Sequence, residues 1–504
     1  MEKYNDISHS NPLTALLMLV LLCTGTRAQT YTQYTTTEEK AWQQSKVSLQ
    51  GKALGKPLMP EPSSGFEFRA WGTCFNELDL DAIRLLTLEE QEHIMHDIFA
   101  PDGDLHFTRG RLTMNANDYS RAWYSCDTVA GDFALKYFNI EHDKQNVIQL
   151  IRMAQKWQPG LTFWMSPWSP PSWMKINQDY PVVSSKWNRQ PKEKDYLLFD
   201  DGGHPDPDEM QFNGERGGLF PRQLASQNYM IQDPRYLQAY ANMFCRFIEL
   251  YGKENIPIDM VMYQNEAYSY TPYPGCAWTA EGTIRFNRDY LAPTLKKEHP
   301  DVSLYIGTFN TNRQDYVQKI VSSVKDCVCG IGFQWEGREN LDFMREHHPE
   351  LAMISSESEC GRGTFDWQAG EHTFYLLHEY IGRGCNEYYI WNFILTDWGT
   401  SPWGWNQNAL IQVDTRTRTY QYTAEYYAVK HFSYFVTPGS RIMAFKPWSK
   451  DDGLQAIVFE RPDKKRVIIC GNTAGEQQII SLQLGKQYLN ATLPAHSFNT
   501  YIER

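Results

Sequence analysis

Hydrophobic positions change their spacing repeatedly between about residues 66 and 393. Apolar residues recur three or four positions apart over 147–154 and 236–248, which predicts an amphipathic helix in each stretch. The second helix also has a start signal, because Asp233 can cap it and Pro234 suits the first helical position. Helical stretches alternate with short apolar runs that predict buried strands. These runs lie at 68–75, 105–114, 161–165, 258–263, 302–307, 329–333, 351–355 and 388–393.

Strands that alternate with helices pair in parallel, and eight such units predict an α/β fold, a (β/α)8 TIM barrel over residues 65–435. This span exceeds the ~250 residues typical of the fold. The excess lies at 177–232, a polar segment rich in Gly and Pro that we predict to be a long insertion loop after the third strand.

The two ends of the chain have a different pattern from the barrel region. Residues 436–504 alternate apolar and polar positions between turn signals, as short antiparallel strands do. Residues 29–64 are polar and end in a stretch rich in Pro and Gly. We therefore expect a small antiparallel β domain attached to the barrel, with partner strands that come from residues 30–60.

The first residues have the features of an export signal. The apolar run at 13–23 is too short to span a bilayer but matches the core of a secretory signal, and small residues up to Ala28 favour cleavage before Gln29. We expect residues 1–28 to be a signal peptide and the protein to be exported. Two alternatives stay open: lipid attachment at Cys23, although the bulky Leu22 precedes it, and a disordered or buried N-terminal helix.

Composition and charge narrow the function classes. Apolar residues make up 42% and charged residues 21%, which suits a globular protein with a full core. A net charge of −12 disfavours nucleic acid and anionic membrane surfaces as partners, and we expect no membrane span. Aromatic residues reach 14%, and an excess of Trp and Tyr favours surfaces that stack on a ligand.

No pattern in the sequence indicates a metal or an organic cofactor, and we expect none. There is no Cys-x-x-Cys pair and no strand-end His cluster with zinc spacing, which also disfavours a metal-dependent hydrolase. The insertion contains four aspartates whose spacing fits no standard calcium loop, namely Asp200, Asp201, Asp206 and Asp208.

Candidate catalytic carboxylates lie where a barrel places its active site, at the carboxyl ends of the strands. Asn265 and Glu266 end the fourth strand, and Glu357 ends the seventh, with Glu359 two residues later. Two carboxylates that face each other across the barrel mouth are what glycoside hydrolysis requires, one as proton donor and one as nucleophile or base. Ordinary strand-end carboxylates are the alternative. A further Asn-Glu pair follows the first strand at 76–77, whereas that at 386–387 precedes the eighth strand and so lies at the opposite end.

Aromatic and charged residues follow the neighbouring strands. Prolines stiffen the segment 166–175, which presents Trp168 and Trp173 as stacking surfaces for a sugar ring, unless these indoles only plug the barrel rim. Arg111 and Asp118 follow the second strand. An arginine there can keep a nucleophile ionised, and an aspartate can accept hydrogen bonds from sugar hydroxyls. A structural Arg–Asp pair is the alternative.

With these motifs in order along the barrel, the chain resembles glycoside hydrolase family 30, a family of retaining (β/α)8 glycosidases. The resemblance rests on residues 71–77, 111–120, 166–175, 263–266, 356–360 and 391–392. It implies that Glu266 is the acid/base, that Glu357 is the nucleophile with Glu359 as rival, and that Asn265 binds the sugar 2-hydroxyl. It also implies an N- and C-terminal β-sandwich, and a sugar subsite lined by Arg111, Asp118, Trp168 and Trp391.

One stretch departs from the family pattern. Relatives often have a Tyr near the end of the sixth strand that contacts the nucleophile, whereas residues 332–336 here contain Trp335, which we expect to contact substrate. The group that hydrogen-bonds Glu357 therefore stays open at this point.

The substrate expectation also rests on resemblance. The stretches 401–408 and 426–432 resemble the β-1,6-glucanase branch more than the xylanase or glucosylceramidase branches. We expect a monomer that cleaves a β-linked oligo- or polysaccharide, with β-1,6-glucan as first candidate. An exo-acting β-glycosidase of the same family, with the 177–232 insertion closing the site, and a catalytically silent carbohydrate-binding protein are the alternatives.

Overall fold

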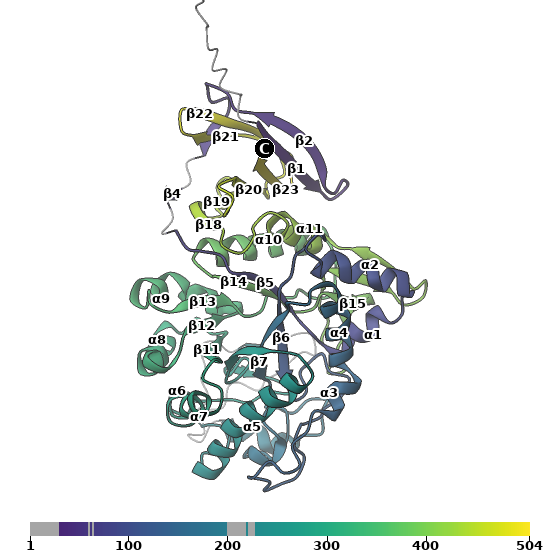
Figure 1. Cartoon of the computed structure of the whole chain (residues 1–504), viewed down its shortest axis with the longest axis vertical. Helices are drawn as coiled ribbons and strands as arrows, with labels where there is room; N and C mark the ends of the chain where they lie inside the picture. The colour runs from purple at the N-terminus through teal and green to yellow at the C-terminus, as the bar shows by residue number, and fades with distance from the viewer. Residues whose placement is uncertain (1–29, 59–60, 63–64, 199–217, 220–226) are drawn as a thin grey trace, which may run out of the picture.

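The computed structural model describes residues 30–58, 61–62, 65–198, 218–219 and 227–504. The predicted signal peptide and the four aspartates of the insertion lie outside the described residues. The chain forms a barrel surrounded by helices, with a β-sandwich above it in Figure 1.

The predicted eight-stranded barrel is confirmed. Its strands close in the order β11-β12-β13-β14-β5-β6-β7-β9, and each pairs in parallel with both neighbours. The second strand starts later than predicted, at Arg109 rather than 105, because His106 has a φ of 54° that interrupts extended backbone. The strands are β5 (Ala70–Cys74), β6 (Arg109–Met114), β7 (Thr162–Pro167), β9 (Ile258–Met262), β11 (Ser303–Phe309), β12 (Gly330–Phe333), β13 (Ala352–Ser355) and β14 (Glu387–Ile390).

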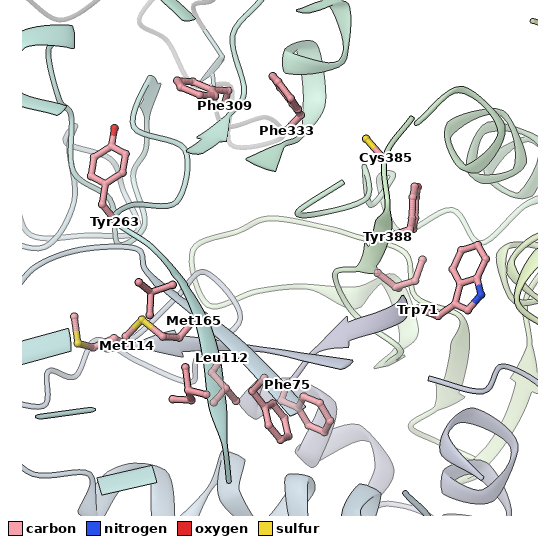
Figure 2. Close-up of a cluster of buried hydrophobic side chains, with 14 of the residues drawn as sticks. Trp71, Phe75, Leu112, Met114, Met165, Tyr263, Phe309, Phe333, Cys385 and Tyr388 are labelled. Carbon is pink, nitrogen blue, oxygen red and sulfur yellow. The ribbon is translucent and has the colours of Figure 1, made fainter. Parts of the chain in front are cut away.

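Successive side chains of each barrel strand alternate between the interior and the surrounding helices. On β7, Phe163 and Met165 belong to the core between barrel and helices, whereas Trp164 belongs to the cluster inside the barrel. The same alternation on β6 places Leu112 in the outer core and leaves Arg111 to point inward. Figure 2 shows part of the outer core, where Leu112 and Met165 gather with other apolar side chains.

Both predicted helices are confirmed. Residues 147–154 fall within α4 (Val147–Trp157), and α5 (Pro234–Lys253) starts as predicted, with the Asp233 carboxylate accepting from the Arg235 N–H at 2.8 Å. The other α-helices are α1 (Glu77–Ile83), α2 (Leu88–Phe99), α3 (Glu141–Gln145), α6 (Ala280–Phe286), α7 (Ala292–Glu298), α8 (Gln314–Val324), α9 (Leu341–His347), α10 (Trp367–Gly382) and α11 (Ala424–Ser433).

Two short sheets lie on the loops that follow barrel strands. β15 (Ile394–Thr396), β16 (Ile411–Asp414) and β17 (Thr419–Tyr422) form a three-stranded sheet after β14. β8 (Gly218–Leu219), from the predicted insertion, pairs with β10 (Ser269–Tyr270). The described part of the insertion also contains the 3-10 helix η2 (Lys192–Leu198) and a hydrogen bond from Gln190 Nε2 to Asp195 Oδ1 at 3.0 Å.

The predicted β-sandwich built from both ends of the chain is confirmed. N-terminal β1 (Thr30–Thr37) pairs antiparallel with C-terminal β23 (Ser497–Glu503) in a seven-stranded sheet, and β3 (Lys56–Leu58) joins β21 and β22 in a second sheet. Side chains such as Tyr31 and Leu482 form an apolar core of their own. The remaining strands are β2 (Gln43–Ser48), β4 (Glu61–Pro62), β18 (Arg441–Lys446), β19 (Leu454–Glu460), β20 (Arg466–Asn472), β21 (Gln478–Leu484) and β22 (Gln487–Leu493).

Within the described residues, no helix combines the length and the apolar character needed to cross a membrane. The nine cysteines of this part of the chain are all free thiols.

A buried histidine joins the barrel to the sandwich. His431 on α11 lies within 2.9 Å of Thr36 Oγ1 on β1 and within 2.8 Å of Thr500 Oγ1 on β23. Burial, assisted by the charge of Lys430, lowers the pKa of His431 to about 3. The folded protein therefore holds this imidazole neutral at mildly acidic pH.

This neutral histidine predicts a loss of stability in acid. Below the unfolded pKa of about 6.5 only the unfolded chain protonates His431, so the free energy of unfolding falls by up to about 1.4 kcal/mol per pH unit until the folded pKa is reached. A His431→Gln variant lacks this term. In urea denaturation, the destabilisation caused by His431→Gln should therefore be about 2.5 kcal/mol smaller at about pH 4.5 than at about pH 7. An equal destabilisation at both values would contradict this account.

Candidate active site

Glu266 lies four residues past the end of β9, on backbone held in an uncommon conformation. Its φ is 45°, a left-handed value that is costly for a residue with a side chain. The Glu266 N–H donates to Thr308 Oγ1 at 3.0 Å, and the Asn265 N–H donates to the Pro167 carbonyl at 2.8 Å. These two contacts anchor the turn to the neighbouring strands β11 and β7.

Glu357 lies two residues past the end of β13 and contacts a buried cation. Arg111 Nη1 donates to Glu357 Oε2 at 2.5 Å and to the Ser356 carbonyl at 3.2 Å. Arg111 is 1% exposed and Glu357 is 6% exposed, so this ion pair is shielded from solvent. The question of which group hydrogen-bonds Glu357, open in the sequence, is answered here by Arg111.

The other nitrogen of the same guanidinium reaches toward Glu266. Arg111 Nη2 donates to Asn265 Oδ1 at 2.7 Å and to Ser166 Oγ at 3.2 Å. The guanidinium carbon also lies 4.6 Å and 4.5 Å from the ring centroids of Trp164 and Trp168, within cation–π range. One side chain therefore links β6, β7, the turn after β9 and the turn after β13. The sequence also allowed a structural ion pair between Arg111 and Asp118. That ion pair is not among these contacts.

Glu266 has neutral hydrogen-bond partners instead of a contacting cation. Gln334 Nε2 donates to Glu266 Oε1 at 3.1 Å, and the Tyr273 hydroxyl donates to Oε2 at 3.3 Å. The Gln334 Oε1 accepts from Ser356 Oγ at 3.0 Å, so this amide bridges the two strand ends. Sequence reasoning missed Gln334 and Tyr273. The signal for Gln334 was its place at the end of β12, whereas no local pattern pointed to Tyr273.

Burial and charge set the protonation of the two glutamates. Burial raises the pKa of both carboxyls. For Glu357 the Arg111 guanidinium opposes this rise in pKa, and the charge of Glu266 adds to it. Arg111 also opposes the rise in the pKa of Glu266, but only Glu357 receives a hydrogen bond from the guanidinium, which favours the ionised form of that carboxyl.

Asp118 belongs to the same group of carboxyls. It is buried, and the charges of Glu357 and Glu266 follow burial as the causes that raise its pKa far above the usual range. Asp118 is therefore electrostatically coupled to the two glutamates, and its contact with a sugar stays a prediction.

Stacked tryptophans form a wall beside the carboxyls. The Trp168 and Trp391 rings lie 5.1 Å apart at an interplanar angle of 25°. Trp391 Nε1 is buried and has no hydrogen-bond partner among the described residues. Both rings belong to an apolar cluster with Tyr119, Tyr273 and Trp403, and partly buried Trp335 packs against it.

Trp335 follows β12 and has a φ of 48°, another strained position at this end of the barrel. Its indole lowers the pKa of Glu357, although its Nε1 has no hydrogen bond of normal geometry with the described residues. The effect of Trp335 on the pKa of Glu357 is therefore weaker than that of Arg111.

The remaining acidic candidates have other partners. Glu359 accepts from Arg338 Nη1 at 2.6 Å and lies 2.8 Å from His372 Nε2, and these two groups lower its pKa. Glu77 lies 2.6 Å from His142 Nε2. Glu387 accepts from the Tyr389 hydroxyl at the opposite end of the barrel, as the sequence predicts. None of these contacts involves Glu266 or Glu357.

Trp173 has its contacts away from Glu266, Glu357 and the tryptophan wall. Its Nε1 donates to the Asp127 carbonyl at 3.3 Å, and its ring packs near Phe133 and Tyr236. Among the described residues, no group of three or more His, Cys, Asp or Glu side chains is placed to hold a metal ion.

Comparison with protein families assigns both parts of the chain. Residues 68–191 and 225–436 match the glycosyl hydrolase family 30 TIM-barrel domain, and residues 439–501 match the β-sandwich domain of the same family. The chain belongs to glycosyl hydrolase family 30. It is therefore a retaining β-glycosidase, whose substrate is a glycan. The barrel match omits 192–224, within the predicted insertion.

Relatives in this family have different named activities. Endo-1,6-beta-D-glucanase neg1 of Aspergillus fumigatus is 20% identical over 528 residues, covering 97% of this chain and 98% of that protein. Lysosomal acid glucosylceramidase of Mus musculus is 22% identical over 505 residues, covering 94% and 89%. The solved structure of the endo-beta1,6-glucanase BT3312 has a TM-score of 0.71 at 19% identity, covering 94% of this chain and 98% of that one.

The position of Arg111 predicts that its shape, and not only its charge, matters for this family 30 enzyme. Lysine retains the charge but cannot bond Glu357, Asn265 and Ser166 together. Arg111→Lys should lower kcat/KM on the best aryl glycoside substrate by on the order of a hundredfold. Arg338→Lys, which alters the ion pair with Glu359, is the matched control and should leave kcat/KM within about threefold. Full activity of Arg111→Lys would contradict this role.

Proposed function

We propose that this enzyme cleaves β-glucosidic bonds by double displacement, with Glu357 as nucleophile and Glu266 as acid/base. The observation that carries the assignment is the unequal contact of the two carboxyls with Arg111. The hydrogen bond from Arg111 favours an ionised Glu357, which can attack. Glu266 has no hydrogen bond to a cation, and burial raises its pKa, which favours a protonated carboxyl that can donate.

In the first step, Glu266 gives its proton to the glycosidic oxygen while a Glu357 oxygen attacks the anomeric carbon. The bond from that carbon to the leaving group breaks, and the sugar becomes an ester of Glu357. In the second step, Glu266, now ionised, takes a proton from water. The water oxygen attacks the anomeric carbon and releases the Glu357 carboxylate, so that the anomeric configuration is retained.

The other residues of the site hold the reacting sugar. Asn265 has its Oδ1 engaged by Arg111, which leaves its amide nitrogen to donate to the sugar 2-hydroxyl. Asp118 accepts from further hydroxyls. Trp168 and Trp391 supply apolar faces, the unpartnered Trp391 Nε1 supplies a donor, and Trp335 contacts the sugar from the β12 side.

We infer that β-1,6-glucan is the substrate. The inference is supported by the 401–408 motif, which places Trp403 in the aromatic cluster beside Trp168, and by the endo-1,6-glucanase relative that matches almost the whole chain. A glucosylceramidase-like, exo-acting glycosidase is the second candidate, supported by the lysosomal relative.

We further propose that the enzyme acts outside the cytoplasm as a monomer, after removal of residues 1–28. The apolar run at 13–23 supports export. A secreted protein whose N-terminal sequence starts at Gln29 would support this proposal, and one that retains the first residues would contradict it.

The assigned roles predict different losses for the two glutamates. Glu357→Gln should lower kcat by about 10⁴-fold or more on every substrate, because no nucleophile remains. Glu266→Gln should be slow on glucans, yet form the glycosyl-enzyme readily from a dinitrophenyl glycoside, whose leaving group needs no proton. Added azide should then accelerate turnover and yield a β-glycosyl azide.

Glu359→Gln provides the matched control for these variants. It removes a carboxylate that pairs with Arg338 and His372, so activity should stay within about tenfold of the parent. Loss of turnover in Glu359→Gln together with an active Glu357→Gln would reverse the assignment.

A substrate panel tests the linkage. Product analysis against β-1,6-, β-1,3- and β-1,4-glucans, galactan, xylan and glucosylceramide should show fastest release of gluco-oligosaccharides from β-1,6-glucan. Cleavage of glucosylceramide alone would favour the second candidate, and xylan or galactan as best substrate would contradict both.

A further inference from the structure

A cavity lined by aromatic rings lies outside the catalytic group, between the loops that follow β6 and β7 and the start of α5. Its volume is about 460 Å³. A cavity of this size falls in the range that holds small ligands. Among the residues that line it are Trp123, Asp127, Thr128, Trp173, Gln178 and Tyr236, and Ala130 lies at its edge.

The lining combines flat apolar faces with hydrogen-bonding groups. Trp123, Trp173 and Tyr236 are each partly exposed, and Thr128 and Gln178 are exposed. Asp127 is 1% exposed, and its Oδ2 has no hydrogen-bond partner among the described residues. Indole and phenol faces beside hydroxyl, amide and carboxylate groups suit a sugar, which has an apolar C–H face and a rim of hydroxyls.

The cavity is connected to the catalytic aromatic wall by two more rings. The Trp123 ring stacks on Tyr180, with 5.0 Å between centroids and an interplanar angle of 17°. The Tyr180 hydroxyl accepts from Trp403 Nε1 at 3.2 Å. Trp403 belongs to the same apolar cluster as Trp168 and Trp391, so aromatic side chains run continuously from the carboxyls to the cavity.

A buried lysine anchors the backbone of this connection. The buried ammonium of Lys175 donates to the carbonyls of Tyr180 at 2.7 Å and Gly275 at 2.6 Å, which holds the Tyr180 backbone in place. The position of the cavity relative to the catalytic wall is therefore fixed, as a site that takes another part of the same ligand requires.

We propose that the cavity lined by Trp123 and Trp173 is a distal sugar-binding subsite that holds a pyranose unit of the same β-glycan chain, away from the bond being cleaved. The inference rests on the proposed glycan hydrolysis and extends it, because a distal subsite favours long chains over short glycosides. It predicts that the enzyme prefers long glycan chains to short glycosides, a preference that the catalytic wall alone does not produce.

The test compares a long and a short substrate in three cavity variants. Trp123→Ala and Trp173→Ala remove stacking faces, and Ala130→Glu places bulk and charge in the cavity from an exposed position where the fold tolerates change. Each variant should lower kcat/KM on soluble β-1,6-glucan by about tenfold, and on an aryl β-glucoside by less than about twofold. Tyr137→Ala, which removes a 53% exposed ring on the same loop but outside the cavity, should change neither value.

The outcomes separate the proposed distal subsite from the proposed cleavage of β-1,6-glucan. If another polymer of the panel is cleaved fastest, the linkage proposal fails and the cavity variants are measured on that polymer. If no polymer is cleaved, affinity electrophoresis of Glu357→Gln through gels with each panel polymer replaces the rate measurement. Polymer rates or mobilities that the cavity variants leave unchanged would overturn the distal subsite, as would an equal fall in polymer and aryl glucoside rates for Ala130→Glu.

Discussion

The structure of the catalytic end depends on one buried guanidinium. A cation inside a protein is costly unless its charge is paired and its hydrogen bonds are satisfied. For Arg111 the charge is paired with Glu357, and its two terminal nitrogens donate to Glu357, Asn265, Ser166 and the Ser356 carbonyl, with indole rings over its faces. Only its Nε has no hydrogen-bond partner among the described residues. Removing any one partner leaves charge or donors unsatisfied. The barrel end and the ionisation of Glu357 are therefore stabilised by the same contacts.

This arrangement makes two chemically identical side chains unequal. Glu357 touches the cation, whereas Glu266 receives hydrogen bonds from the amide of Gln334 and the hydroxyl of Tyr273. Both are buried, so local partners rather than solvent decide which one loses its proton first. A retaining glycosidase needs this difference, since one carboxyl must attack while the other still has a proton to give.

Much of the fold could be predicted because its signals are local. Short apolar runs marked all eight barrel strands, and Asp233 with Pro234 marked the start of α5. Turn residues and alternating positions predicted the C-terminal strands, whereas the β-sandwich shared with the N-terminal segment was implied by the family resemblance. The start of β6 was misplaced because apolar residues before Arg109 are buried without being extended, and no spacing rule detects the positive φ of His106.

The candidate site could be predicted only as far as strand ends reveal it. Glu266, Glu357 and Trp168 follow strands and were found in this way. The difference between Glu357 and Glu359 depends on Arg111, Arg338 and His372, which lie far apart along the chain. Gln334 and Tyr273 acquire their importance from contacts with Glu266 that only the folded barrel creates.

The most direct measurement of the central claim is to trap the covalent intermediate. An activated 2-deoxy-2-fluoro-β-glucoside slows both steps but leaves the sugar on the nucleophile, and peptide mass spectrometry then locates it. We expect inactivation with a single fluoroglucosyl group on Glu357, and much slower labelling in Arg111→Lys. Labelling of Glu359 or Glu266 in its place would contradict the account.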